Sequence, residues 1–80
     1  MLMIYGTRQC PDTLACLADL EAARIPFEFR DITLLPVLKE FMQLRDSNPI
    51  FAPVRAAGGV GIPLLVMDDG SLSFEWSPLL

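Results

Sequence analysis

The spacing of apolar and polar residues predicts three elements in the first half of the chain. Residues 2–5 form a short apolar run that indicates a strand, and the loop GTRQ follows it. A helix is expected over residues 11–24, because Pro11 suits a first helical turn and Pro26 ends the pattern. The segment PFEFRDI then alternates apolar and charged residues, which is typical of a half-buried strand. The apolar stripe of the expected helix consists of Leu14, Leu17, Ala18 and Leu20.

The second half predicts a long helix, a short helical turn and a hairpin. Thr33 is the expected N-cap of a helix over about residues 34–46, and the segment IFAPVRAAGG predicts one further helical turn ending at Gly58. Residues 64–67 are continuously apolar, as in a central strand covered on both faces, and the Asp69-Gly70 pair predicts a two-residue hairpin turn. The stripe of the long helix is expected to contain Leu34, Val37, Leu38, Phe41, Met42 and Arg45. In the last strand Leu72, Phe74 and Trp76 are expected to face one way.

This order of elements, β-α-β-α-β-β, predicts an α/β fold. The first β-α-β unit favours a parallel pair of strands with a right-handed crossover, and the final hairpin must be antiparallel. We therefore expect a mixed four-stranded sheet with helices packed on it. A chain of 80 residues corresponds to a single domain, residues 1–80.

Charge and composition exclude several classes of partner. The net charge is −4 and there is no run of Lys or Arg, which argues against nucleic acid and against an anionic membrane surface. No apolar segment approaches the roughly 18 residues of a membrane span. The N-terminal MLMIY is short and has no basic residue before it, so we expect a strand and not a signal peptide. Two cysteines without a secretion signal indicate a reducing compartment, the cytoplasm.

Cys10 is the candidate for chemistry, because it lies at the junction of the first strand and the first helix. The chain has no histidine, which removes Cys-His and Ser-His-Asp nucleophiles and the usual zinc sites. At a helix N-terminus the free N–H groups and the dipole stabilise a thiolate. Arg8 could add positive charge, whereas Asp12 opposes the thiolate, and the sequence does not decide between them. The alternative is a buried cysteine that happens to begin a helix.

Cys16 is expected to be a packed, inert thiol. Six residues along a helix advance about 9 Å, more than the roughly 7 Å between Cα atoms that a disulfide allows. Cys16 shares a stripe with Leu20 and Ala23. Thr13 occupies the position from which a second thiol could reach Cys10 across one turn, so a working Cys10 would act alone.

The ordered set of motifs resembles the glutaredoxins, within the thioredoxin fold. CPDT follows the first strand, and later segments are EFRDIT, LKEF, LRD, GIP and DDG. They are most similar to a group of small bacterial glutaredoxin-related proteins with a CPDC motif, over residues 3 to about 74. The resemblance implies that Cys10 is the nucleophile, that Pro11 and Thr13 complete a monothiol motif, and that Arg8 lies beside the thiol site. It also implies a cis peptide bond before Pro63, where a trans proline would otherwise be expected, and a role for the Ile62 backbone in binding the peptide of a thiol compound.

The C-terminal segment departs from that pattern. FEWSPLL carries neither the Gly-Gly nor the acidic pair that hold glutathione in glutaredoxins, and the C-terminal helix is expected to be short or missing. The apolar surface left uncovered predicts a homodimer through the C-terminal strand region. Its expected members are Leu72, Phe74, Trp76, Leu79 and Leu80.

The resemblance implies a thiol-disulfide oxidoreductase that acts on glutathione-protein or other mixed disulfides. Glutathione or another small thiol would be the cosubstrate, with no tightly bound cofactor and no metal. The alternative is a non-catalytic glutaredoxin-like module that binds a partner or carries an iron–sulfur cluster as a dimer.

Overall fold

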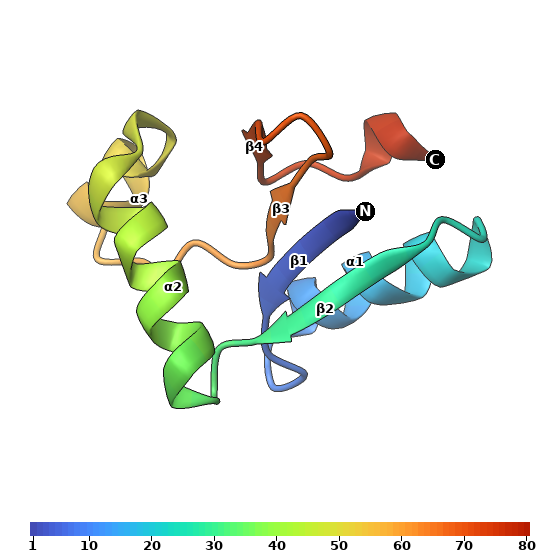
Figure 1. The fold of residues 1–80 in the computed structure, drawn as a ribbon, viewed down its shortest axis with the longest axis horizontal. Coiled ribbons are helices and arrows are strands. Elements are labelled where there is room, and N and C mark those ends of the chain that lie inside the picture. Colours follow the sequence, from blue (N-terminus) through green and yellow to red (C-terminus); the bar gives the residue numbers. More distant parts are fainter.

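A mixed four-stranded sheet lies at the centre of the molecule (Figure 1). The computed structural model describes residues 1–80. The strands β1 (Leu2–Gly6), β2 (Phe27–Asp31), β3 (Leu64–Val66) and β4 (Leu72–Ser73) are arranged in the order β2-β1-β3-β4. β1 and β2 are parallel, and the other two pairs are antiparallel. The predicted α/β architecture with a mixed sheet is confirmed.

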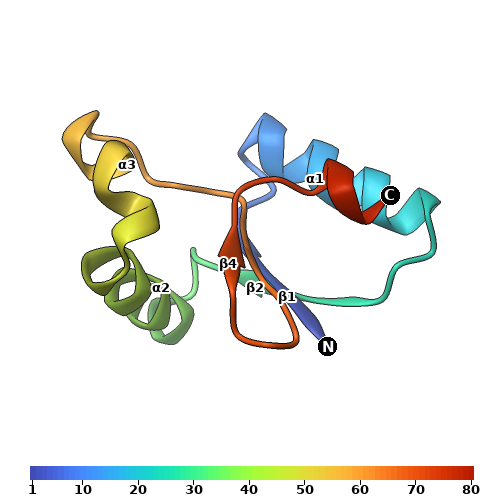
Figure 2. The ribbon, with the colours of Figure 1, turned by 90° about the horizontal axis from the view of Figure 1, so that it is seen from above.

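Helices cover both faces of this sheet (Figure 2). α1 (Pro11–Ala22) lies on one face, together with the C-terminal 3-10 turn η2 (Ser77–Leu79). α2 (Leu35–Ser47), the 3-10 turn η1 (Pro49–Phe51) and α3 (Ala52–Ala56) lie on the other. None of these helices combines the length and the apolar character that crossing a bilayer requires.

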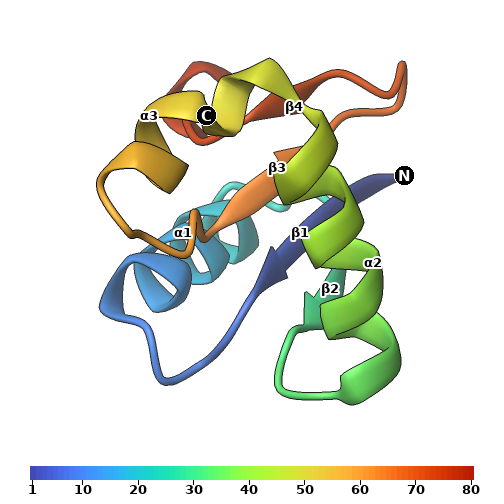
Figure 3. The same ribbon diagram turned by 90° about the vertical axis from the view of Figure 1, so that its left-hand side faces the viewer.

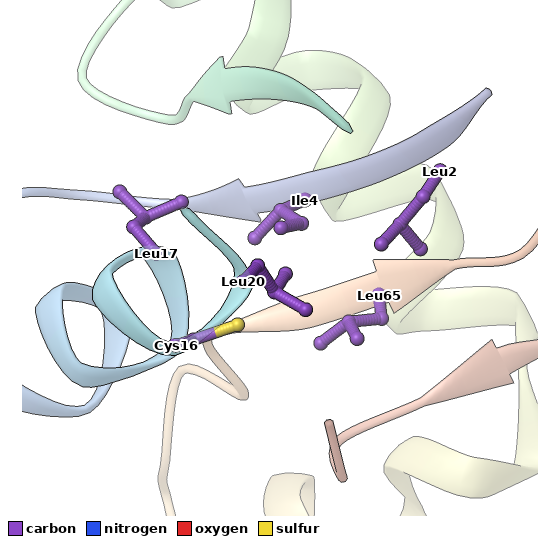
Figure 4. Close-up of a cluster of buried hydrophobic side chains, with 6 residues drawn as sticks. All are labelled: Leu2, Ile4, Cys16, Leu17, Leu20 and Leu65. Carbon is purple, nitrogen blue, oxygen red and sulfur yellow. The ribbon is translucent and has the colours of Figure 1, made fainter. Parts of the chain in front are cut away.

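The core between the sheet and α1 follows directly from the two periodicities of the sequence. Every second residue of β1 faces α1, and residues three or four positions apart on α1 pack against them. Figure 4 shows the Cys16 side chain among them, with its Sγ toward Leu20 and Leu65. Cys16 is fully buried, so the prediction of a packed thiol is confirmed. The buried members are Leu2, Ile4, Cys16, Leu17, Leu20 and Leu65.

The second core lies between the sheet and α2, and it is mostly aromatic. Phe41 of α2 packs against Tyr5 and, edge to face, against Phe51, with ring centroids 6.0 and 5.9 Å apart. Phe51 also contacts Phe74 edge to face at 5.1 Å. Val37 and Leu64 complete the buried set.

Two apolar members of the predicted α2 stripe are exposed, and of the stripe only Val37 and Phe41 are buried in this core. Leu34 is 57% exposed because it is the N-cap residue, with extended backbone, and precedes the helical stripe. Met42 is 38% exposed, and Leu44 packs against the core instead. The helix thus buries a narrower stripe than the sequence predicts.

A polar bridge joins α2 to β1 and β2. The Tyr5 hydroxyl donates to Glu40 Oε1 at 3.0 Å, and Arg30 forms an ion pair with the same carboxylate. Burial and the Glu40 carboxylate raise the pKa of Tyr5, so the phenol stays protonated and keeps donating at neutral pH.

The predicted N-cap of α2 is wrong, because the helix begins at Leu35, its N-cap is Leu34 and no side chain caps it. The Thr33 N–H and hydroxyl donate to Asp31 Oδ1 at 2.9 and 2.8 Å, which lowers the pKa of the Asp31 carboxyl. Asx turns of this kind compete with capping. α1 also ends two residues before the predicted Arg24, which takes a left-handed conformation with φ of 58°.

The β3–β4 turn is longer than the predicted two-residue turn. Gly70 N–H donates to Met67 C=O at 2.9 Å and Met67 N–H donates to Ser71 C=O at 2.8 Å. Gly70 has φ of 87°, whereas Asp69 has a negative φ and cannot form the expected turn. Asp68 and Asp69 therefore occupy the turn itself, and Gly70 supplies the left-handed residue that follows it.

The last strand was predicted too long, and this changes where Trp76 lies. β4 ends at Ser73, whose hydroxyl accepts from Glu75 N–H at 2.9 Å and turns the chain. Leu72 and Phe74 pack against the aromatic core, whereas Trp76 packs against the α1 core and donates from Nε1 to Asp19 Oδ2 at 2.8 Å.

The uncovered apolar patch predicted at the C-terminus is therefore smaller than expected. Leu72, Phe74 and Trp76 are each partly buried, while Leu79 and Leu80 are 36% and 58% exposed. The homodimer inferred from that patch stays a prediction.

Candidate functional site

Cys10 caps the N-terminus of α1, as the sequence predicts. The residue has extended backbone (φ −96°, ψ 122°), Pro11 occupies the first turn, and the Cys10 C=O accepts from Leu14 N–H at 3.0 Å. A turn connects β1 to Cys10, and in it the Cys10 N–H donates to Thr7 C=O at 3.0 Å. The thiol is free and partly exposed. The alternative of a cysteine sealed in the core is thereby excluded.

The surroundings of Cys10 favour its ionised form. Partial burial is the largest influence and opposes ionisation, and the Asp12 carboxylate adds a small opposing charge. Three groups that could donate to a thiolate outweigh them, namely the Thr13 N–H, the Thr13 hydroxyl and the Asp12 N–H. Together they hold the pKa of Cys10 below that of an ordinary cysteine.

Thr13 is the unusual residue at this site. It is fully buried, and its Oγ1 has no hydrogen-bond partner within the protein. A buried hydroxyl without a partner is costly, and a thiolate at Cys10 would relieve that cost by accepting its proton. Thr13 thus favours ionisation of the neighbouring sulfur.

Gly6 at the end of β1 makes the burial of Thr13 feasible. A Cβ at Gly6 would lie 2.7 Å from both Thr13 Oγ1 and Cγ2. In the sequence, Gly6 is expected only to begin the loop GTRQ after the first strand. Nothing in the local pattern indicates that the next helix packs a side chain against it.

Replacing Thr13 by valine is expected to raise the pKa of Cys10 without destabilising the fold. Valine keeps the shape but removes a donor to the thiolate, and it also removes a buried hydroxyl whose lack of a partner costs about 1–3 kcal/mol. The pH dependence of iodoacetamide alkylation should shift to higher pH, and thermal unfolding should occur at the same or a higher temperature.

Thr33→Val is the matched control for this variant, because it removes a hydroxyl that is bonded to Asp31 and has no influence on the pKa of Cys10. It should leave the alkylation profile unchanged. An unaltered profile in Thr13→Val would show that the Thr13 hydroxyl does not act on the sulfur.

A groove beside the first turn of α1 contains the predicted Ile62–Pro63 pair. The peptide bond between them is cis, as expected. Figure 3 shows the loop that leads into β3 passing beside the start of α1. The groove encloses about 410 Å³. Its walls include Asp12, Ile62, Pro63, Phe74, Glu75 and Trp76.

The structure brings some of the predicted site residues together and separates others. Ile62 and Pro63 share the groove with Asp12, two residues after Cys10, and Thr13 acts on Cys10 itself. Pro11 is exposed at the helix start. Arg8 is directed elsewhere, because its guanidinium stacks over the Phe29 ring at 4.5 Å and its charge lowers the pKa of Asp31.

Sequence reasoning missed the groove walls that the C-terminal segment supplies. Phe74, Glu75 and Trp76 reach the groove because β4 pairs with β3, whose approach loop carries Pro63. The sequence predicts that pairing, but not the turn at Ser73 that separates Phe74 from Trp76. No group of three or more His, Cys, Asp or Glu residues is placed to hold a metal ion.

Comparison with known proteins places the chain beside one relative in particular. An uncharacterized protein of Haemophilus influenzae is 35% identical over 78 residues, which cover 96% of this chain and 91% of the relative. The chain belongs to the family of this protein. No family model matches the sequence, and no solved structure matches it either. The similarity spans both the Cys10 junction and the cis-proline loop.

Proposed function

We propose that the protein is a thiol-disulfide oxidoreductase that works through Cys10 alone, on a thioredoxin-like fold of glutaredoxin type. The observation that carries the proposal is the state of Cys10, a partly exposed thiol at a helix N-terminus with a lowered pKa. The strand order β2-β1-β3-β4 supports the fold assignment. A reducing compartment such as the cytoplasm would keep this thiol free.

The reaction has three exchange steps, and Cys10 takes part in the first two. The Cys10 thiolate attacks one sulfur of a mixed disulfide, so a bond forms to Cys10 Sγ while the substrate S–S bond breaks. The leaving thiolate takes a proton from water. A small external thiol, in its thiolate form, then attacks the bound sulfur, and the Cys10 thiolate leaves. A second molecule of that thiol resolves the new mixed disulfide, so two electrons pass from the external thiols to the substrate.

Cys16 cannot replace the external thiol in the second step. Burial and the Asp19 charge raise the pKa of Cys16 to about 11, so it is protonated at neutral pH. It is also fully buried in the α1 core. The monothiol route therefore fits Thr13 at the position where dithiol enzymes have a second cysteine.

The test is the pH profile of Cys10 alkylation in a Cys16→Ala background. We expect iodoacetamide to react with half-maximal rate below pH 8.5, the approximate pKa of a free cysteine. A cysteine-containing peptide measured in the same buffers serves as the reference. A half-maximal rate at or above that of the peptide would count decisively against the proposal.

A further inference from the structure

The groove beside Cys10 is acidic and aromatic. Asp12 and Glu75, two exposed acidic residues, line its walls. Phe74 and Trp76 contribute aromatic surface, and the indole is fixed because its Nε1 donates to Asp19. The walls contain no lysine or arginine. A ligand in this groove meets negative charge and π-faces together.

Most basic side chains of the protein are engaged elsewhere. Arg8 stacks on Phe29, Arg30 pairs with Glu40, and Arg45 donates to Gly59 C=O. Arg55 donates to the C=O groups of Arg45 and Asn48. Neither Asp12 nor Glu75 forms a salt bridge, and no basic residue lines the groove to neutralise them.

The Asp12 carboxylate links this groove to the reacting sulfur. It lies in the groove wall, and its charge is also felt at Cys10, two residues earlier. A group held against Asp12 is thus close to the sulfur that Cys10 attacks. Charge in that group affects how well the substrate binds and how stable the bound state is.

We propose that the preferred substrate of Cys10 is a disulfide that carries a positively charged group next to its sulfur, held between Asp12, Glu75 and the aromatic wall. This inference rests on the proposed function and specifies its substrate class. Carboxylates attract an ammonium or guanidinium, and aromatic faces bind such cations as well. Glutathione carries two carboxylates and one ammonium, so the same groove disfavours it.

In chemical terms, the Cys10 thiolate attacks the sulfur that bears the cationic group. A bond forms between this sulfur and Cys10 Sγ, the substrate S–S bond breaks, and the other half leaves as a thiolate that takes a proton from water. A small external thiol in its thiolate form then attacks the sulfur that bears the cationic group. The bond between this sulfur and Cys10 Sγ breaks, and Cys10 leaves as the thiolate. A second external thiol completes the reduction, so the external thiols become a disulfide and the substrate two thiols.

Three small symmetric disulfides of similar size test this preference. Cystamine is cationic, 2-hydroxyethyl disulfide is neutral and 3,3′-dithiodipropionate is anionic. The rate at which each forms a mixed disulfide with Cys10 is followed by mass spectrometry in the Cys16→Ala protein. The quantity compared is the ratio of the cystamine rate to the dithiodipropionate rate, because the fraction of Cys10 that is ionised cancels in it.

Glu75→Gln should lower this ratio by at least about fourfold. Removing one carboxylate slows the cationic disulfide and speeds the anionic one, each by about two- to fivefold for a charge pair several ångströms apart in water. Asp12→Asn should lower the ratio in the same direction. Glu21→Gln, an equal charge change at an exposed position of α1, should leave it unchanged. Raising the salt concentration to 1 M should also reduce the ratio, since screening then acts within about 3 Å.

The outcomes separate this inference from the function on which it rests. If none of the disulfides reacts with Cys10, the proposed function fails and the substrate class fails with it. If all three react, but Glu75→Gln and Asp12→Asn leave the ratio where it was, the thiol chemistry stands and the cationic preference is overturned. A ratio that falls in both groove variants and not in Glu21→Gln supports the preference.

Discussion

Replacing Cys10 by serine is expected to reduce disulfide exchange to the rate measured without protein. A serine hydroxyl is not ionised at neutral pH, and only a thiolate attacks a disulfide sulfur effectively. The change is small in volume and lies at a partly exposed N-cap, where serine is itself a favourable residue. The variant should therefore fold as well as the natural chain and lose only its chemistry. Reduction of 2-hydroxyethyl disulfide, coupled to an external thiol, measures the effect.

Cys16→Ala is the matched control, since it removes the other thiol. Alanine is preferred to serine here because Cys16 is fully buried among leucines, where a hydroxyl would lack a partner. This variant should keep its exchange rate even if it loses about 1 kcal/mol of stability from the small cavity. Loss of exchange in Cys16→Ala at full folding would contradict the one-thiol mechanism.

The local sequence pattern was sufficient to predict those features of the site that depend on a single helix. A proline in the first helical turn placed Cys10 at the N-cap, and the spacing to Thr13 placed that residue one turn away. Helical geometry alone separated Cys16 from Cys10, and the structure buries Cys16 in the α1 core as expected. These outcomes depend on φ, ψ and helix periodicity, which the sequence constrains directly.

The contacts of side chains that have several possible partners could not be predicted in this way. Arg8 was expected beside the thiolate, but the Phe29 ring of β2 offers a surface on which it stacks. Thr33 was expected to cap α2, but the Asp31 carboxylate accepts both of its donors. In each case the deciding partner is available only once the chain has folded or turned locally, so residue type and spacing do not rank the alternatives.

The C-terminal segment shows the same limit at the level of a whole strand. Alternation of Leu72, Phe74 and Trp76 reads as one continuous strand face. Instead, the Ser73 hydroxyl accepts a hydrogen bond from Glu75 N–H and stabilises a turn, and the Trp76 indole donates to Asp19 of α1. One polar contact between residues far apart in sequence therefore moved Trp76 to the opposite side of the sheet and created the wall of the groove.

Replacing Phe51 by alanine is expected to have the largest effect on stability. Phe51 is fully buried and its ring contacts two other aromatic rings edge to face. Truncating such a side chain costs about 3–5 kcal/mol, and an 80-residue domain has a total free energy of unfolding of only about 4–12 kcal/mol. Urea denaturation followed by Trp76 fluorescence should show a much lower midpoint. Leu35→Ala, at a position that is 61% exposed, should change stability by no more than about 0.5 kcal/mol.

Phe51 also connects the aromatic core to the groove, so a milder substitution should separate stability from function. A Cβ at Gly61 would lie 2.6 Å from the Phe51 ring, which means that the ring packs directly against the backbone leading into Ile62 and Pro63. Gly61 itself has φ of 92°, so only glycine fits there comfortably. Phe51→Leu keeps an apolar side chain but withdraws ring atoms from Gly61 and Phe74. We expect this variant to remain folded, to keep the pH profile of Cys10 alkylation, and to exchange disulfides with a lower kcat/KM, because the sulfur is unaffected while the groove wall is loosened. An unchanged kcat/KM in a folded Phe51→Leu protein would mean that the groove does not take part in binding the disulfide, whatever the state of Cys10.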